Sequence, residues 1–187
     1  MRLKWMVSLV LILAVGGWTV TTALWAQARS SDPRITMMDN CSDTDPAYGE
    51  FGGCPEGAPF PGSRSYSGDV TAAEFFALLF SPLAPGQPIG HPSWRNEPSF
   101  ASAREGQNIQ ISNRGGRAHT FTKVENFGGG FVLPLNGTMA QAPECANPEQ
   151  LTFVPYGGSQ TLTGLEPGLH KFQCCIHPWM RAAVRVN

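Results

Sequence analysis

The feature that most constrains this sequence is a change of hydrophobic period at about Pro98. From there to the C-terminus, short segments alternate apolar with polar residues, and Gly or Pro separates most of them. The clearest segments are 108–112, 151–154, 159–163 and 183–186. Because no helical pattern lies between them, this region is predicted to be all-β, a sandwich or barrel rather than a parallel α/β sheet.

Composition supports a packed domain with many tight turns. The chain has 187 residues, of which 21 are Gly and 16 are Pro, while charged residues make up only 14% and hydrophobic residues 42%. Such a chain is neither a charge-rich disordered protein nor a coiled coil. The formal net charge is −1 and there is no run of Lys and Arg, so the sequence gives no reason to expect nucleic-acid binding.

The N-terminus has the pattern of a secretory signal. Arg2 and Lys4 precede an uncharged apolar stretch, residues 5–25, which is followed by the small-residue pattern Ala-Gln-Ala. We therefore predict a signal peptide over residues 1–28. The apolar stretch is also long enough to span a bilayer, so an uncleaved membrane anchor is the alternative. In both cases the domain is exported, to the periplasm or the extracellular space.

Two further regions precede the β-rich part. Residues 29–68 are rich in Asp, Gly, Pro and Ser, and are predicted to be an irregular acidic lead segment. Residues 69–94 are predicted to hold one short helix and a linker, because Thr71 and Glu74 have capping-box spacing ahead of an apolar run. One hypothesis is that this helix covers an open sheet edge or the base of the sandwich through Phe75, Phe76, Leu78 and Leu79.

Metal-binding side chains concentrate near the C-terminus. The segment Phe-Gln-Cys-Cys-Ile-His-Pro-Trp-Met, residues 172–180, places Cys174, His177 and Met180 on one predicted turn between two strands. A thiolate, an imidazole and a thioether form a set that suits copper better than magnesium or calcium. His119 lies on a predicted strand after a glycine turn, and it is the candidate for a second imidazole.

This constellation resembles the cupredoxins, or blue copper proteins, and the short Cys-x2-His-x2-Met loop is more similar to amicyanin than to plastocyanin. The resemblance covers the predicted copper domain, residues 95–187. It implies a Greek-key β-sandwich that holds one type 1 copper and acts as a one-electron carrier rather than an enzyme. By resemblance, the ligands are His119, Cys174, His177 and Met180.

The resemblance also implies how electrons would enter or leave. In the family the loop histidine has an edge near the surface, so redox partner proteins are expected to dock at an apolar patch made of His177, Pro178 and Trp179. Thr120, beside His119, is a candidate for a group that donates a hydrogen bond near the copper ligands. A Thr on a strand is also an ordinary strand former.

Five cysteines are an odd number for an exported protein, and a copper thiolate accounts for one of them. Successive side chains on a strand point to opposite faces, so Cys175 faces away from the metal if Cys174 faces it. Of the three pairings open to the other four cysteines, we favour Cys41 with Cys54 and Cys145 with Cys175. Free thiols, a bridge between Cys174 and Cys175, and a shift of the ligand to Cys175 are the alternatives.

The same residues give less support to other functions. After His119 and His177 only His91 and His170 remain, too few for a second, catalytic copper site. Copper binding or delivery outside the cytoplasm is the main alternative, with the adjacent pair Met37 and Met38 as its support. A structural zinc site, or a domain in which metal only stabilises the fold, are further alternatives.

Overall fold

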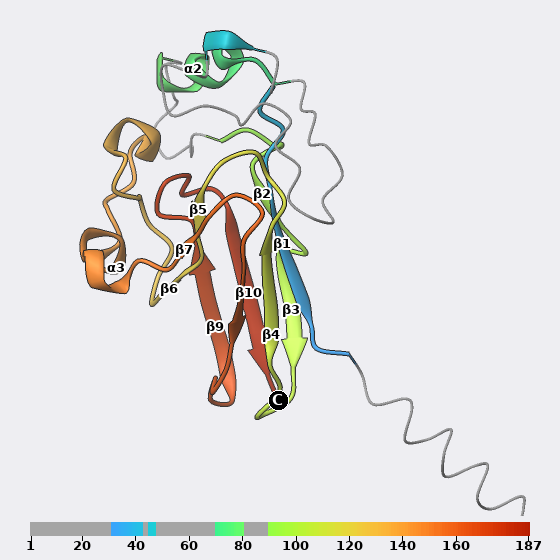
Figure 1. Ribbon diagram of the computed structural model, residues 1–187. Helices are drawn as coiled ribbons and strands as arrows, with labels where there is room; N and C mark the ends of the chain where they lie inside the picture. The colour runs from blue at the N-terminus through green and yellow to red at the C-terminus, as the bar shows by residue number, and fades with distance from the viewer. Residues whose placement is uncertain (1–30, 43–44, 48–69, 81–89) are drawn as a thin grey trace, which may run out of the picture. The chain divides into compact units, whose positions relative to one another are not determined.

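The computed structural model describes residues 31–42, 45–47, 70–80 and 90–187, with the side chains of residues 78–80 excepted. The predicted signal peptide and most of the lead segment and linker lie outside these residues. In the unit formed by residues 32–187, two four-stranded sheets pack against each other around one apolar core (Figure 1).

Each sheet is built from strands that are distant in the chain. The first has the order β2 (Arg95–Glu97), β1 (Arg34–Met38), β4 (Ile109–Asn113), β8 (Ser159–Leu162). The second has the order β3 (Phe100–Ala103), β10 (Arg181–Val186), β9 (Gly168–Gln173), β6 (Thr122–Val124). A small third sheet pairs β5 (His119–Thr120) with β7 (Phe153–Val154). The helical elements are α2 (Ala72–Phe80), η2 (Leu133–Asn136), α3 (Pro143–Ala146) and η3 (Pro148–Gln150).

The pairings fit a Greek-key sandwich rather than a meander. Strand β1 is parallel to β4 and β3 is parallel to β10, while the other pairs are antiparallel. The all-β sandwich predicted from the sequence is confirmed. The predicted strands at 108–112, 159–163 and 183–186 correspond to β4, β8 and β10, and 151–154 contains the short β7.

The lead segment differs from the prediction. Residues 34–38 are not irregular but form β1, which lies inside the first sheet between β2 and β4. The reason is the alternation of Ile35 and Met37, both fully buried, with Arg34 and Thr36. This alternation spans only five residues, so it is a weak signal in the sequence. The sandwich therefore begins with β1 and not at residue 95.

The core lies between the two sheets and follows the alternation of the strands. The buried apolar positions of β4 are Ile109 and Ile111, and those of β10 include Val184 and Val186. The rings of Phe121 and Phe172 stack inside, with centroids 4.8 Å apart. Side chains of alternate residues thus meet across the sandwich, as close packing of two sheets requires.

Helix α2 has the capping box expected from its sequence. The Glu74 carboxylate accepts the Thr71 backbone N–H at 2.9 Å, and the Thr71 hydroxyl accepts the Glu74 N–H at 3.2 Å. The expected packing of this helix on the sandwich through Phe75 and Phe76 is found, and it lies at the end that holds His177. Helix α2 lies at the upper end in Figure 1, and its Phe75 ring packs against Trp94, at a centroid distance of 4.9 Å, and against His177. The side chains of Leu78 and Leu79 lie outside the described ones.

No helix among the described residues combines the length and the apolar character that crossing a membrane requires.

The contact between α2 and the sandwich gives a stability prediction. Phe75 is 9% exposed and belongs to the main core, so Phe75→Ala removes a large buried ring and leaves a cavity. We expect the free energy of unfolding to fall by about 3–5 kcal/mol, measured by urea denaturation. Phe100→Ala is the control, because Phe100 is 53% exposed and its loss is expected to change stability by about 0.5 kcal/mol or less. Equal effects of the two substitutions would contradict the packing of α2.

Candidate metal centre

Three buried side chains bring metal-binding atoms together at one end of the sandwich. The Nδ1 atoms of His119 and His177 are 3.3 Å apart. The Sγ of Cys174 is 3.9 Å from the Nδ1 of His119 and 3.8 Å from that of His177. Among the described residues, this is the one group of three or more His, Cys, Asp or Glu residues that could hold a metal ion.

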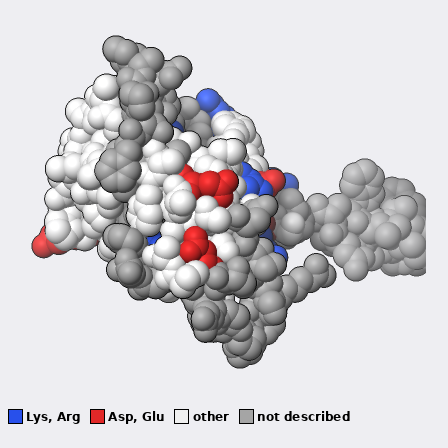
Figure 2. All heavy atoms as spheres, turned by 90° about the horizontal axis from the view of Figure 1, so that it is seen from above, with Lys and Arg blue, Asp and Glu red and all other residues white. Residues whose placement is uncertain are grey.

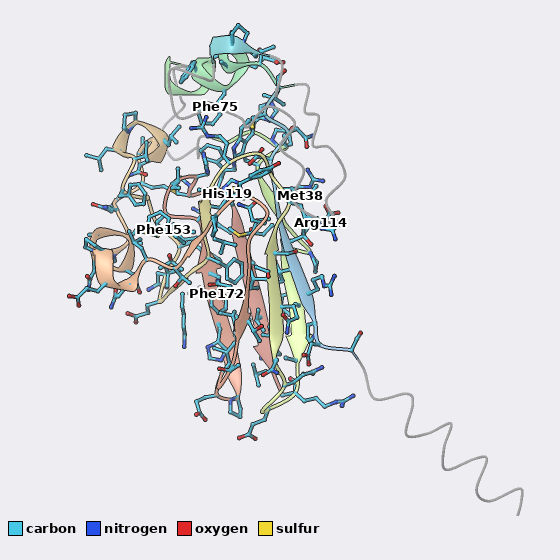
Figure 3. All side chains as sticks on the ribbon, in the orientation of Figure 1. Met38, Phe75, Arg114, His119, Phe153 and Phe172 are labelled. Atoms are coloured by element: carbon cyan, nitrogen blue, oxygen red, sulfur yellow. A yellow bond between two sulfur atoms is a disulfide. The ribbon has the colours of Figure 1, made fainter. Side chains whose placement is uncertain are left out.

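Two elements position these donors. His119 opens the short strand β5, where it lies opposite Val154 of β7 (Figure 3). Cys174 and His177 belong to the tight loop that joins β9 to β10. The Cys174 N–H donates to the Met180 carbonyl at 3.0 Å, and the Met180 N–H donates to the His177 carbonyl at 2.9 Å. Because these bonds close the loop on itself, the spacing of three residues between Cys174 and His177 brings both side chains to the same place.

The sulfur of Cys174 accepts two backbone hydrogen bonds. The N–H groups of Thr120 and His177 each lie 3.4 Å from it. The Thr120 hydroxyl in turn accepts the Cys175 N–H at 2.7 Å. Thr120 therefore lies beside the candidate ligands, as the sequence analysis expected. Thr120 donates to the sulfur through its main-chain N–H, and its hydroxyl fixes the backbone at Cys175, next to Cys174.

A fourth polar residue, missed in the sequence analysis, contacts the cluster. Asp39 follows β1 directly, is fully buried, and its Oδ2 lies 2.8 Å from the Nε2 of His119. It lies 80 residues from His119 in the chain. No spacing motif links two residues that far apart, and Asp39 is one acid among several in a polar segment, so the sequence offered no signal for it.

The loop histidine is covered, which corrects the expectation of an exposed edge. His177 is 3% exposed, and its ring lies against the rings of Phe75, Trp94 and Trp179, at centroid distances of 5.8, 6.2 and 5.6 Å. Pro178 is also buried, and Trp179 is partly exposed. The cover includes α2 and Trp94, both from segments that precede His119 in the chain and that no resemblance at the C-terminus could reveal.

Met180 and the cysteines complete the surroundings. Met180 is fully buried in the same core cluster as Cys174. Cys174 is a buried free thiol, whereas Cys175 forms a disulfide with Cys145, as predicted. Cys175 belongs to a separate small cluster beside α3, so successive cysteines do face opposite sides. Cys54 lies outside the described residues, and its pairing with Cys41 stays a prediction.

The remaining two histidines lie elsewhere. The Nδ1 of His91 accepts the Ser93 N–H at 3.2 Å, and the Nε2 of His170 lies 2.7 Å from the Glu166 carbonyl oxygen. Neither joins the cluster of His119, Cys174 and His177. The described residues therefore contain no second His-based metal site.

The electrostatics of the cluster favour an ionised thiol. Burial raises the pKa of Cys174, but its contacts with His119 and His177 more than offset this and hold the pKa well below 9.0. Burial lowers the pKa of His119, yet the hydrogen bonds with Asp39 and Cys174 raise it to about 9. Burial lowers the pKa of His177, so this imidazole is neutral. The metal-free cluster thus contains a thiolate beside an imidazolium.

The donor set fits a metal ion that prefers nitrogen and sulfur. A point equidistant from the three donor atoms lies about 2.1 Å from each, and bonds from such metals to imidazole and thiolate are about 2.0–2.3 Å long. Two imidazoles and one thiolate, with a buried thioether in the loop that carries Cys174 and His177, are a set typical of copper electron-transfer sites. Structural zinc sites usually take four Cys or His ligands.

Comparison with known proteins adds structural neighbours only. No protein-family model matches the chain, and no curated protein matches it. A purple cupredoxin from Nitrosopumilus maritimus is 17% identical, with a TM-score of 0.37, over 52% of this chain and 86% of that one. Two amicyanin variants, both in the Cu(I) form, are 19% and 18% identical, with TM-scores of 0.34 and 0.35; the matches cover 50% and 58% of this chain and 73% and 89% of theirs.

The fold itself is the all-β sandwich of two four-stranded sheets described above. At these low identities and TM-scores, the assignment of residues to a metal site rests on the geometry described above.

The opposed pKa shifts determine how stability depends on pH. The raised pKa of His119 contributes stability that is present below pH 6.5 and lost as the pH rises to about 9. The lowered pKa of Cys174 contributes stability that is present above pH 9.0 and lost as the pH falls through its folded value. Below pH 9 and above the folded pKa of Cys174 the two trends oppose each other, so each offsets part of the other's pH dependence in the metal-free protein.

The same shifts predict the charge of the thiol. We expect the ultraviolet thiolate absorbance of Cys174 in the metal-free protein to persist well below pH 9.0, with metal-free Cys174→Ser as the blank. In the unfolded chain the thiol should titrate near its ordinary value. A folded protein whose thiolate signal disappears near pH 9 would contradict the ion pair with His119.

Proposed function

We propose that this protein is an exported type 1 copper protein of the amicyanin kind that carries single electrons. The observation that carries the proposal is the buried triangle of His119, His177 and Cys174 donor atoms, two imidazoles and one thiolate, which is the ligand type of copper electron-transfer sites. When bound, copper supplies a one-electron couple between Cu(I) and Cu(II). His119, Cys174 and His177 would hold it, with Met180 as a weak fourth ligand.

The chain's own residues suit such a role. Two backbone N–H groups point at the Cys174 sulfur, and the surrounding side chains are mostly apolar and buried. A rigid, dry donor set limits rearrangement when the charge changes, and hydrogen bonds to the sulfur tune the reduction potential. We propose an electron carrier rather than an enzyme, because the described histidines outside the cluster have partners elsewhere.

Export is part of the proposal. The N-terminal pattern of residues 1–28 suggests it, and the Cys145–Cys175 disulfide is consistent with an oxidising compartment such as the periplasm or the extracellular space.

Copper delivery receives less support. Met37, half of the methionine pair that favoured it, is fully buried in β1 as a core residue. A delivery protein needs its soft ligands where a partner can reach them, and His177 is 3% exposed. We therefore place this function second.

A redox partner would meet an unusual surface. Because Phe75 and Trp94 lie against His177, the exposed part of the expected docking segment is Trp179, which contacts the His177 ring. Figure 2, a view from the end at which α2 lies, shows that the described surface there is mostly uncharged, with a few acidic and basic groups. We propose that a redox partner docks through apolar contact around Trp179.

The ligand assignment is tested with copper-loaded protein. Wild type should show intense thiolate-to-copper charge-transfer absorption and the electron paramagnetic resonance spectrum of a type 1 site. Cys174→Ser and His177→Ala should each abolish both signals, because each removes a donor atom. His170→Ala is the matched control and should keep them. A colourless wild type, or colour that survives Cys174→Ser, would refute the proposal.

Met180 is tested separately through the potential. Met180→Leu keeps the buried volume but replaces the thioether with an alkyl group, so the charge-transfer band should remain. The axial ligand tunes the potential of such sites, and a weaker ligand favours Cu(I), so the reduction potential measured by voltammetry should rise. An unchanged potential would show that Met180 is only a core residue.

A further inference from the structure

Asp39 is a buried carboxylate surrounded by N–H donors. Its Oδ1 accepts the backbone N–H groups of Gly116, at 2.8 Å, and Cys41, at 3.3 Å. Its Oδ2 accepts the Arg117 N–H at 3.1 Å and lies 2.8 Å from the Nε2 of His119. No part of its side chain is exposed to solvent. A charge buried to this degree is costly unless hydrogen bonds satisfy it, and here several do.

The chemistry of these contacts determines where the proton of His119 lies. An ionised carboxylate only accepts hydrogen bonds, so the Nε2 atom of His119 must carry a proton and donate it to Asp39. The other ring nitrogen, Nδ1, points toward Cys174 and His177. A metal ion needs the lone pair of Nδ1, and a proton held at Nε2 by Asp39 leaves that lone pair for the metal.

The segment before His119 is shaped around this carboxylate. A Cβ atom at Gly115 would overlap the Oδ2 of Asp39, so only glycine fits there. Asn113 braces the same loop from the other side: its side chain accepts the Gly115 N–H at 2.9 Å and donates to the Arg117 carbonyl at 2.7 Å. Asp39 thus makes hydrogen bonds of two kinds, three with backbone N–H groups and one with the imidazole of His119.

We propose that Asp39 is the positioning residue of the metal site: its carboxylate fixes the orientation and the tautomer of His119 so that Nδ1 is the ligand atom. This inference rests on the proposed function, since it assumes that His119 binds copper. A negative charge hydrogen-bonded to a ligand imidazole also makes that imidazole a stronger donor. The negative charge of a carboxylate that contacts a ligand imidazole interacts more strongly with a divalent ion than with a monovalent one. Asp39 therefore favours Cu(II) over Cu(I).

The test is the isosteric substitution Asp39→Asn in the copper protein. The amide is neutral, and turning its oxygen to His119 places its NH2 against the Gly116 N–H. Loss of such an outer partner lowers metal affinity by about 10–100-fold, and we expect that loss in Cu(II) affinity with a smaller change for Cu(I). If Cu(I) affinity is unchanged, the reduction potential rises by about 60–120 mV, at 59 mV per tenfold change for a one-electron couple.

Two control variants separate this role from a structural one. Asp45→Asn removes the same charge from another lead-segment acid, whose Oδ2 accepts the Ala72 N–H at the start of α2. Asn113→Ala loosens the same loop without touching His119. Both should keep the wild-type potential. The proposal is overturned if wild type is blue and Asp39→Asn has the same reduction potential and Cu(II) affinity. It is also overturned if Asn113→Ala shifts the reduction potential as much as Asp39→Asn does.

A measurement on the wild-type protein tests the proposal even if the variants do not fold. In the Cu(I) form, which is diamagnetic, nuclear magnetic resonance should show a slowly exchanging proton on the Nε2 of His119 and none on its Nδ1. An unprotonated Nε2 would overturn the proposal even if every variant is unstable. A wild type that binds no copper through Cys174 would instead refute the proposed function, so the two failures are distinguishable.

Discussion

Burial of a thiol and two imidazoles within hydrogen-bonding distance of one another is the constraint on which the rest of this end of the molecule depends. Polar groups removed from water destabilise a fold unless partners satisfy them. Here the Cys174 sulfur accepts hydrogen bonds from two backbone N–H groups, and the Nε2 of His119 is hydrogen-bonded to Asp39. Without metal, the cluster is stabilised as a thiolate beside an imidazolium, and the ion that replaces the proton on Nδ1 enters a site whose other hydrogen bonds are already made.

The apolar cover over His177 follows from the same constraint. Phe75 and Trp94 come from segments before the loop that carries Cys174 and His177, yet their rings lie on the imidazole. A dry site strengthens the electrostatic interactions inside it, since charges are screened less in an apolar medium. The cover also separates His177 from solvent. Helix α2 is therefore part of the site's environment, and its loss would change both stability and access.

Local patterns in the sequence were sufficient for the parts of the site that lie close together in the chain. The spacing of Cys174, His177 and Met180 predicts their convergence because a single turn brings them together, and the capping box at Thr71 predicts the start of α2. The alternation of β4 and β10 is long enough to recognise. Strand β1, Asp39 and the cover of His177 could not be predicted, because each is defined by pairing or packing between residues far apart in the sequence.

The neighbouring residues Cys174 and Cys175 have different roles: the first is a buried thiol beside the two imidazoles, and the second forms a disulfide. Cys174 faces the main core and contacts both imidazoles, while Cys175 turns to the other side and bonds Cys145 in α3. The Cys175 carbonyl also accepts the Phe131 N–H at 2.8 Å, and a Cβ at Gly130 would overlap that carbonyl. The backbone that carries the thiolate is thus held by a covalent bond, by Thr120 and by a close glycine contact. These contacts keep the sulfur in place without adding any polar group to the side that faces His119 and His177.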